Sequence, residues 1–204
     1  MIKAILFDMD GVLVDSFEAW AKLVDATASH FGYPSVGREE FLNVYGQSTE
    51  LDVAKFFPGS TVLEIDNYYE VHFEDFKEFV VPIKESRDVI NALKVNGIKT
   101  SVITNTGGRL ARTILSDLGI IVDCVVGGDE VSNAKPSSDI VFKACETLGV
   151  LPCESVVVGD SIYDMESASA AGAHSVGING VSGDHTLSSL SELFAILDNF
   201  ICES

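Results

Sequence analysis

The sequence has few basic residues. Thirteen lysines and arginines stand against 31 aspartates and glutamates among 204 residues, which gives a formal net charge of −18. Proteins that bind nucleic acids present a basic face to the phosphate backbone, and anionic membrane surfaces attract basic segments. The composition therefore argues against both partners. A small anionic substrate is compatible with this charge only where a metal ion or a local lysine or arginine reverses the field.

Cysteine is also scarce. The four cysteines, Cys124, Cys145, Cys153 and Cys202, form no C-x-x-C pair and have no histidine close to them in the sequence. This pattern is typical neither of a zinc site nor of the disulfide framework of a small secreted domain. We expect all four to be reduced thiols of a cytoplasmic protein.

Long apolar runs are missing as well. No stretch approaches the roughly 20 apolar residues of a membrane-spanning helix. The apolar start of the chain is too short for a secretory signal and meets Asp8 directly. With 47% hydrophobic and 22% charged residues, the composition is that of a globular protein with a real core, which excludes wholesale disorder.

Short apolar, β-branched segments alternate with amphipathic ones over most of the chain. The expected strands span residues 3–7, 100–103, 122–126, 155–158 and 174–178, and the expected helices span residues 86–94, 109–118, 138–148 and 164–171. Near-continuous apolar strands are typical of a parallel sheet that is covered on both faces. The alternation predicts βαβ units, and thus an α/β fold with a Rossmann-like, three-layer parallel sheet core.

Residues 16–80 interrupt this alternation, and no buried strand is expected there. The segments 16–31, 38–44, 49–56 and 62–79 are predicted helices, with Ser16 as the N-cap of the first. Within the last helix, an inward face is expected from Ile65, Tyr68, Tyr69, Phe73, Phe76 and Phe79. We therefore predict a core formed by residues 1–15 and 81–204, an all-helical cap of residues 16–80 inserted after the first strand, and a terminal packing helix at 187–201.

Polar residues follow the ends of the predicted strands. They are Asp8, Asp10, Thr104, Asn105, Lys135, Asp160 and Asp164. Ligands of open parallel sheets bind outside the carboxyl ends of the strands, so we expect these side chains to converge. Four carboxylates at one rim repel each other unless a cation lies between them, and oxygen donors together with a phosphate are what Mg²⁺ prefers.

Each of these segments alone has a structural explanation. The D-M-D-G sequence could be a turn, Thr104 and Asn105 could cap the following helix, and Lys135 could be a solvated residue before a helix-starting proline. Asp164 could be an acid in the first turn of a helix. Their joint occurrence, each beyond a strand end, favours a functional site.

Together the segments resemble the motifs of the haloacid dehalogenase superfamily, in its phosphoglycolate phosphatase and β-phosphoglucomutase type with a helical cap. The first motif is similar to residues 7–16, FDMDGVLVDS, and the second to residues 102–105, VITN. The third is similar to Lys135-Pro136, and the fourth to residues 159–161, GDS, with Asp164-Met165 and Ala171-Gly172. The match spans the whole core but does not specify a substrate.

The resemblance implies catalytic roles at the first motif. Asp8 would be the nucleophile that forms an aspartyl-phosphate. Asp10 would protonate the leaving oxygen and then activate the hydrolytic water. The Mg²⁺ cofactor would be held by the side chains of Asp8 and Asp160 and by the backbone carbonyl of Asp10, with Asp164 as an indirect ligand.

The resemblance also implies a substrate-binding set. Thr104, Asn105 and Lys135 would bind the phosphate, with Thr104 and Lys135 taking part in catalysis. The cap loop 45–49, through Gln47 and Ser48, would select the substrate. The expected partner is a small phosphorylated metabolite, bound by a monomer or a homodimer.

The implied function is that of a Mg²⁺-dependent phosphatase, with phosphoglycolate the first expected substrate by family frequency. A phosphosugar mutase of the β-phosphoglucomutase type is an alternative. A non-catalytic phospho-acceptor domain is another, although such domains are shorter and carry the acceptor aspartate after a later strand. A dehalogenase or a phosphonatase is disfavoured because those branches lack the second acid, here Asp10.

Overall fold

The computed structural model describes residues 1–197 and contains a six-stranded parallel sheet in the order β5-β4-β1-β6-β7-β8. Its strands are β1 (Ala4–Phe7), β4 (Lys99–Thr104), β5 (Cys124–Gly127), β6 (Ser155–Gly159), β7 (His174–Gly177) and β8 (His185–Thr186). The predicted α/β fold class is confirmed. The two-residue strand β8 was not predicted, because it has no apolar run of its own.

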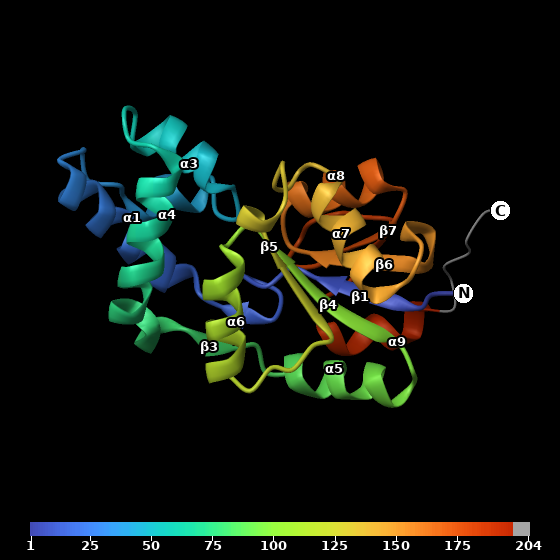
Figure 1. Ribbon diagram of the computed structural model, residues 1–204. Coiled ribbons are helices and arrows are strands. Elements are labelled where there is room, and N and C mark those ends of the chain that lie inside the picture. The colour runs from blue at the N-terminus through green and yellow to red at the C-terminus, as the bar shows by residue number, and fades with distance from the viewer. Residues whose placement is uncertain (198–204) are drawn as a thin grey trace.

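Helices cover both faces of the sheet (Figure 1). On one face lie α5 (Ser86–Val95), α6 (Gly108–Asp117) and α9 (Leu193–Ile196), and on the other lie α7 (Asp139–Leu148) and α8 (Ile162–Ala171). Ile5 packs in the first layer and Leu6 in the second, since successive side chains of a strand point to opposite faces. The expected three layers are therefore present.

The register of β1 aligns the carboxyl ends of the central strands. Phe7 pairs with Val102 of β4 on one side and with Val158 of β6 on the other. Short turns leave these strand ends, among them η2 (Gly128–Glu130) after β5, while η3 (Pro152–Glu154) precedes β6. Residues directly after β1, β4 and β6 thus start from the same edge of the sheet.

A helical insertion follows β2 (Val14–Asp15), which pairs antiparallel with β3 (Val81–Pro82). Between these two short strands lie α1 (Phe17–Phe31), α2 (Arg38–Leu42), α3 (Thr49–Phe56), α4 (Val62–His72) and the 3-10 helix η1 (Phe73–Phe79). These helices form a separate group beside the sheet (Figure 1), and we call them the cap. The short antiparallel pair joins the cap to the strands.

The predicted single helix at 62–79 is wrong in its second half. The α-helix ends at His72, and a 3-10 helix continues from Phe73 to Phe79. Ile65, Tyr69 and Phe73 are buried as expected, but Phe79 is exposed at the end that leads to β3, where the Lys22 ammonium lies 4.8 Å from its ring centroid.

Two further expectations need correction. In place of one packing helix at 187–201, the described part of this segment holds the 3-10 turn η4 (Leu190–Glu192) and the four-residue α9, and residues 198–201 lie outside the described residues. Cys124 and Cys145 are free, but Cys153 is disulfide-bonded, so the expectation of four reduced thiols is wrong for it. Cys202 also lies outside the described residues.

Within residues 1–197, no helix combines the length and the apolar character needed to cross a bilayer.

Leu6 tests the layer formed by α7 and α8, because its side chain is fully buried there. We expect Leu6→Ala to lower the free energy of unfolding by about 2–5 kcal/mol, since it leaves a cavity that the layer cannot fill. Val95→Ala, at a position that is 87% exposed, should change it by less than about 0.5 kcal/mol. Urea unfolding measures both, and similar effects of the two variants would contradict this account of the core.

Candidate active site

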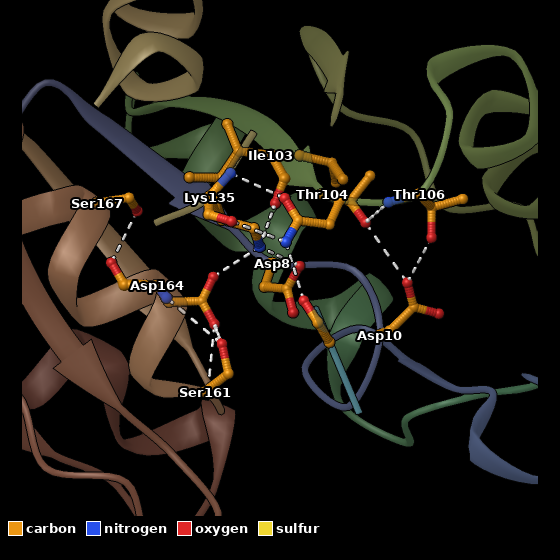
Figure 2. Close-up of polar contacts among 12 residues, drawn as sticks. Asp8, Asp10, Ile103, Thr104, Thr106, Lys135, Ser161, Asp164 and Ser167 are labelled. Atoms are coloured by element: carbon orange, nitrogen blue, oxygen red, sulfur yellow. Dashed lines mark hydrogen bonds and ion pairs between the residues drawn. The ribbon is translucent and has the colours of Figure 1, made fainter. Parts of the chain in front are cut away.

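Lys135 lies at the centre of the buried charges (Figure 2). Its Nζ donates to Asp8 Oδ1 and to Asp164 Oδ1, each at 2.7 Å, and to the carbonyl of Ile103 at 3.1 Å. Burial alone would lower the pKa of Lys135, but the carboxylates of Asp164 and Asp8 outweigh it and raise the pKa. The lysine is therefore a permanent cation, and the solvated alternative considered for it is wrong, because it is only 2% exposed.

Three carboxylates surround this cation. Oxygens of Asp8, Asp160 and Asp164 lie within 4.8 Å of one another. Burial raises the pKa of Asp8 well above its usual range, Lys135 opposes this shift, and the carboxylates of Asp164, Asp160 and Asp10 add to it. Burial and the neighbouring Asp164 raise the pKa of Asp160 to about 7. The single positive charge of Lys135 does not neutralise the negative charge of these three carboxylates.

Two glycines let the carboxylates come this close. Gly11 has a φ of +81°, and a Cβ placed on it would lie 1.9 Å from Asp160 Oδ2. A Cβ on Gly159 would lie 2.2 Å from Cβ of Asp164. Any side chain at either position would push a carboxylate out of the cluster, so the chain is shaped to hold these acids together.

The cluster fits a hard divalent cation. Asp8 and Asp160 offer oxygen donors, and Mg²⁺ is bound through one or two carboxylates together with waters and substrate phosphates. Both oxygens of Asp164 are engaged: Oδ1 accepts from Lys135, and Oδ2 accepts from the backbone N–H of Ser161 at 3.2 Å in a capping box at the start of α8. The sequence left open whether Asp164 is an acid in the first turn of a helix or part of the charged site. The structure shows that it is both.

Asp10 lies beside this cluster, with its carboxylate among hydrogen-bond donors. Ser16 Oγ and Trp20 Nε1 donate to Oδ1, the latter at 3.1 Å, and Thr106 Oγ1 donates to Oδ2 at 3.0 Å. Thr104 Oγ1 lies 3.4 Å from Oδ2. Burial raises the pKa of Asp10, and the hydrogen bonds from Ser16, Trp20 and Thr106 oppose that shift. Hydrogen bonds to both of its oxygens therefore fix the orientation of this carboxyl group.

Ser16, Trp20 and Thr106 were missed from the sequence. Ser16 does occupy the N-cap position of α1, but its side chain makes no cap hydrogen bond and turns to Asp10 and to the Tyr45 hydroxyl, 2.9 Å away. The predicted N-cap position of Ser16 is therefore confirmed, while its side chain serves Asp10 and not the helix end. Two of the three carried a sequence signal: Ser16 ends the segment that resembles the first motif, and Thr106 is a second hydroxyl just after Thr104.

Asn105 connects three segments. Its Oδ1 accepts from the backbone N–H of Lys135 at 2.9 Å, and its Nδ2 donates to the carbonyls of Lys135 at 3.2 Å and of Gly46 at 2.9 Å. Gly46 belongs to the cap loop predicted to select the substrate. The amide of Asn105 therefore fixes the backbone that carries Lys135 and also ties the cap to the edge of the sheet.

A cavity of about 200 Å³ separates the cap from this edge. Its lining includes Asp8, Asp10, Thr104 and Asn105 from the sheet side and Tyr45 and Gln47 from the cap. Ser48 is buried at the N-cap position of α3 and is not part of the lining. The structure thus brings the predicted residues of the sheet edge together with Gln47, but not with Ser48.

The pKa of Asp160 predicts how pH and Mg²⁺ act on stability. Its value is about 7 in the folded, metal-free protein and about 4 in an unfolded chain. The contribution of this group to stability is therefore complete below about pH 4 and is lost as the pH rises to about 7. In EDTA, we expect wild type to lose more free energy of unfolding between about pH 5.5 and 8 than Asp160→Asn does.

Mg²⁺ should reverse this loss, because a cation stabilises the ionised form. At about 100 times its Kd near pH 8, we expect it to raise the Tm of wild type by roughly 5–10 °C, and by less near pH 5.5. Asp160→Asn should lose most of that increment, whereas Asp88→Asn, an exposed acid on α5, should keep it. Scanning calorimetry measures each value, and an equal Mg²⁺ effect in Asp160→Asn and wild type would contradict the assignment.

Comparison with known proteins agrees with this geometry. The profile of the haloacid dehalogenase-like hydrolase family matches residues 5–178. A phosphoglycolate phosphatase of Aquifex aeolicus is 30% identical over 212 residues, covering 99% of this chain and 100% of the relative. A PpaX protein of Caldanaerobacter subterraneus subsp. tengcongensis, named as a candidate pyrophosphatase, is 33% identical over 181 residues, covering 87% of this chain and 81% of the relative.

Solved structures give the same result. CbbY from Rhodobacter sphaeroides, whose crystal structure contains phosphate, superposes with a TM-score of 0.79 at 26% identity, covering 97% of this chain and 100% of that one. The residues matched by the family profile include those at the sheet edge. The chain belongs to the haloacid dehalogenase-like hydrolase family, and it is an enzyme of the phosphatase type within that family.

Proposed function

We propose that this enzyme hydrolyses small phosphate monoesters through an aspartyl-phosphate on Asp8, with Mg²⁺ as cofactor. The observation that carries the proposal is the position of Lys135, whose ammonium joins Asp8 to Asp164 at 2.7 Å in a buried site. A lysine held in this way keeps the nucleophile Asp8, which lines the cavity, in place and brings a positive charge next to it.

Asp8 is suited to attack phosphorus once its charge is balanced. An ionised carboxylate needs no base to act as a nucleophile. Its approach to an anionic phosphate is opposed by repulsion, so offsetting that charge is the main catalytic task in phosphoryl transfer. Mg²⁺, held by Asp8, Asp160 and the Asp10 carbonyl, would supply positive charge at the phosphate and keep Asp8 ionised. Lys135 supplies the second positive charge from the protein itself.

Asp10 is suited to the proton transfers. Its carboxyl lies in the same cavity as Asp8 but outside the cluster of three carboxylates. Burial raises its pKa, which favours the protonated form that can donate to a leaving oxygen. After that donation, the carboxylate can accept a proton from the water that hydrolyses the aspartyl-phosphate. Ser16, Trp20 and Thr106 hold it in one orientation for both steps.

Thr104 and Asn105 complete the phosphate side of the cavity, as the resemblance implies. Thr104 Oγ1 accepts from the N–H of Thr106 at 3.1 Å and donates to Asp10 Oδ2 at 3.4 Å, so a bound phosphate oxygen would take its hydroxyl proton from Asp10. Asn105 acts mainly through the backbone that it fixes, since its amide already contacts Lys135 and Gly46. On the cap side, Gln47 faces the leaving group, and the cap helices exclude water from the reaction.

A single-turnover reaction in H₂¹⁸O tests the covalent step. With p-nitrophenyl phosphate and Mg²⁺, a carboxylate oxygen of Asp8 forms the bond to phosphorus as p-nitrophenolate leaves, and water then attacks phosphorus and releases Asp8 with both of its own oxygens. We therefore expect one ¹⁸O in the released phosphate and no label in Asp8, whereas attack of water on the acyl carbon would label Asp8. Hydroxylamine added during turnover attacks the acyl carbon of the aspartyl-phosphate and leaves a hydroxamate on Asp8.

Variants separate this mechanism from direct attack by water. Asp8→Asn should abolish turnover and trapping, whereas Asp88→Asn, far from the cavity on α5, should leave both unchanged. Mass spectrometry of the peptide that contains residue 8 gives the readout. Turnover by wild type without any hydroxylamine adduct on Asp8, or full activity of Asp8→Asn, would contradict the proposal.

A further inference from the structure

We propose that the leaving alcohol of the substrate carries no second anionic group and instead offers hydroxyl or ammonium hydrogen-bond donors. This inference rests on the proposed phosphatase function and concerns the part of the cavity that receives the leaving group. It points away from phosphoglycolate, pyrophosphate and sugar bisphosphates, each of which would bring a second negative charge to that part.

The cavity wall beyond Asp8 and Asp10 is acidic. Asp52, Asp66 and Glu70 line it from the cap, and Asp129 lines it from the turn after β5. Arg109 is the one lysine or arginine among the described residues that line the cavity. Its Nε lies 3.1 Å from Glu70 Oε1, so that charge is already paired, and its side chain is 85% exposed.

Asp52 is the most deeply buried of these acids. It is 7% exposed and accepts from Gln47 Nε2 at 2.7 Å and from the Tyr69 hydroxyl at 3.0 Å. Burial raises its pKa to about 6, and the two hydrogen bonds oppose that shift. At neutral pH its carboxylate is therefore mostly ionised. It also holds Gln47, for which the family resemblance implies a role in substrate selection.

Asp66 and Asp129 act on each other across the gap between cap and core. Burial raises the pKa of Asp66, and the charges of Glu50, Asp129 and Glu70 add to that shift, while a hydrogen bond from Thr49 opposes it. Asp129 is fixed in place because its Oδ1 accepts from the N–H of Gly108 at 2.7 Å. Two carboxylates from opposite walls thus face the same space.

A second anion in this space would meet the like charge of these carboxylates, and Arg109, the arginine on the lining, is already paired with Glu70. Repulsion between like charges strongly weakens the binding of a ligand. Hydroxyl or ammonium donors would instead pair with the carboxylate oxygens of Asp66 and Asp129. The aromatic side chains of Trp20, Tyr45 and Tyr69 on the same lining favour an uncharged or cationic group as well.

Three phosphate esters of nearly equal size test the inference. Phosphoethanolamine, 2-hydroxyethyl phosphate and phosphoglycolate share a two-carbon leaving group that is cationic, neutral and anionic in turn. With Mg²⁺ and the full chain near neutral pH, we expect kcat/KM for phosphoglycolate to be at least about tenfold below the other two, equivalent to about 1.4 kcal/mol. The ratio of phosphoethanolamine to 2-hydroxyethyl phosphate shows whether ammonium or hydroxyl is the better donor.

Charge-removing variants test the wall itself. Asp66→Asn should reduce several-fold the ratio of kcat/KM for 2-hydroxyethyl phosphate to kcat/KM for phosphoglycolate. Asp129→Asn provides the same test from the core wall if the first variant does not fold. Glu40→Gln removes a cap carboxylate outside the cavity and should leave the ratio unchanged. The readout is the ratio of the two kcat/KM values within each variant. A general loss of activity lowers both values and leaves this ratio unchanged.

The outcomes separate this inference from the proposed function. If p-nitrophenyl phosphate is hydrolysed and phosphoglycolate is used as well as or better than the other two esters, the inference is overturned while the phosphatase stands. Refusal of all three two-carbon esters by an enzyme that hydrolyses p-nitrophenyl phosphate also overturns it. If no ester is hydrolysed with Mg²⁺, the proposed function fails and the inference fails with it.

Discussion

The contact of Lys135 with Asp8 and Asp164 is the interaction on which the site depends. A buried lysine and two buried carboxylates are costly to remove from water, and their attraction repays this only where the geometry holds them together. The register of β1 with β4 and β6 supplies that geometry, and Gly11 lets Asp160 approach as a third acid. The remaining negative charge is what suits the cluster to a divalent cation.

The cap and the sheet edge form one unit through two polar links. Asn105 joins Gly46 of the cap loop to the backbone of Lys135, and Ser16 joins Tyr45 to Asp10. A movement of the cap loop would therefore disturb the residues that carry the chemistry. The charge along the cavity differs from one end to the other: Asp8, at the sheet edge, is paired with the buried Lys135, whereas Asp52, Asp66 and Glu70 line the cap side without a lysine partner. This difference is why we argue for substrates with a single anionic group.

The sequence predicted the strands because a buried parallel strand leaves an unmistakable run of apolar, β-branched residues, and it predicted the cluster because the polar residues follow those runs. It could not show that Trp20 and Thr106 donate to Asp10, since that contact depends on how α1 packs against the sheet edge. The division of residues 62–79 into an α-helix and a 3-10 helix was not predicted, because over a segment as short as Phe73–Phe79 repeats of 3.6 and 3.0 residues place apolar side chains almost alike. Ser48 was included in the predicted site because its neighbours in the loop were, although it is buried and does not line the cavity. The domain boundaries and the oligomeric state stay predictions.

The most direct test of the central claim is a crystal structure of the enzyme soaked with Mn²⁺, an anomalous scatterer that takes the place of Mg²⁺. We predict one strong anomalous peak at roughly 2.1–2.2 Å from carboxylate oxygens of both Asp8 and Asp160, with Lys135 still in contact with Asp8. Data that show these carboxylates in place but no anomalous peak between them would contradict the account.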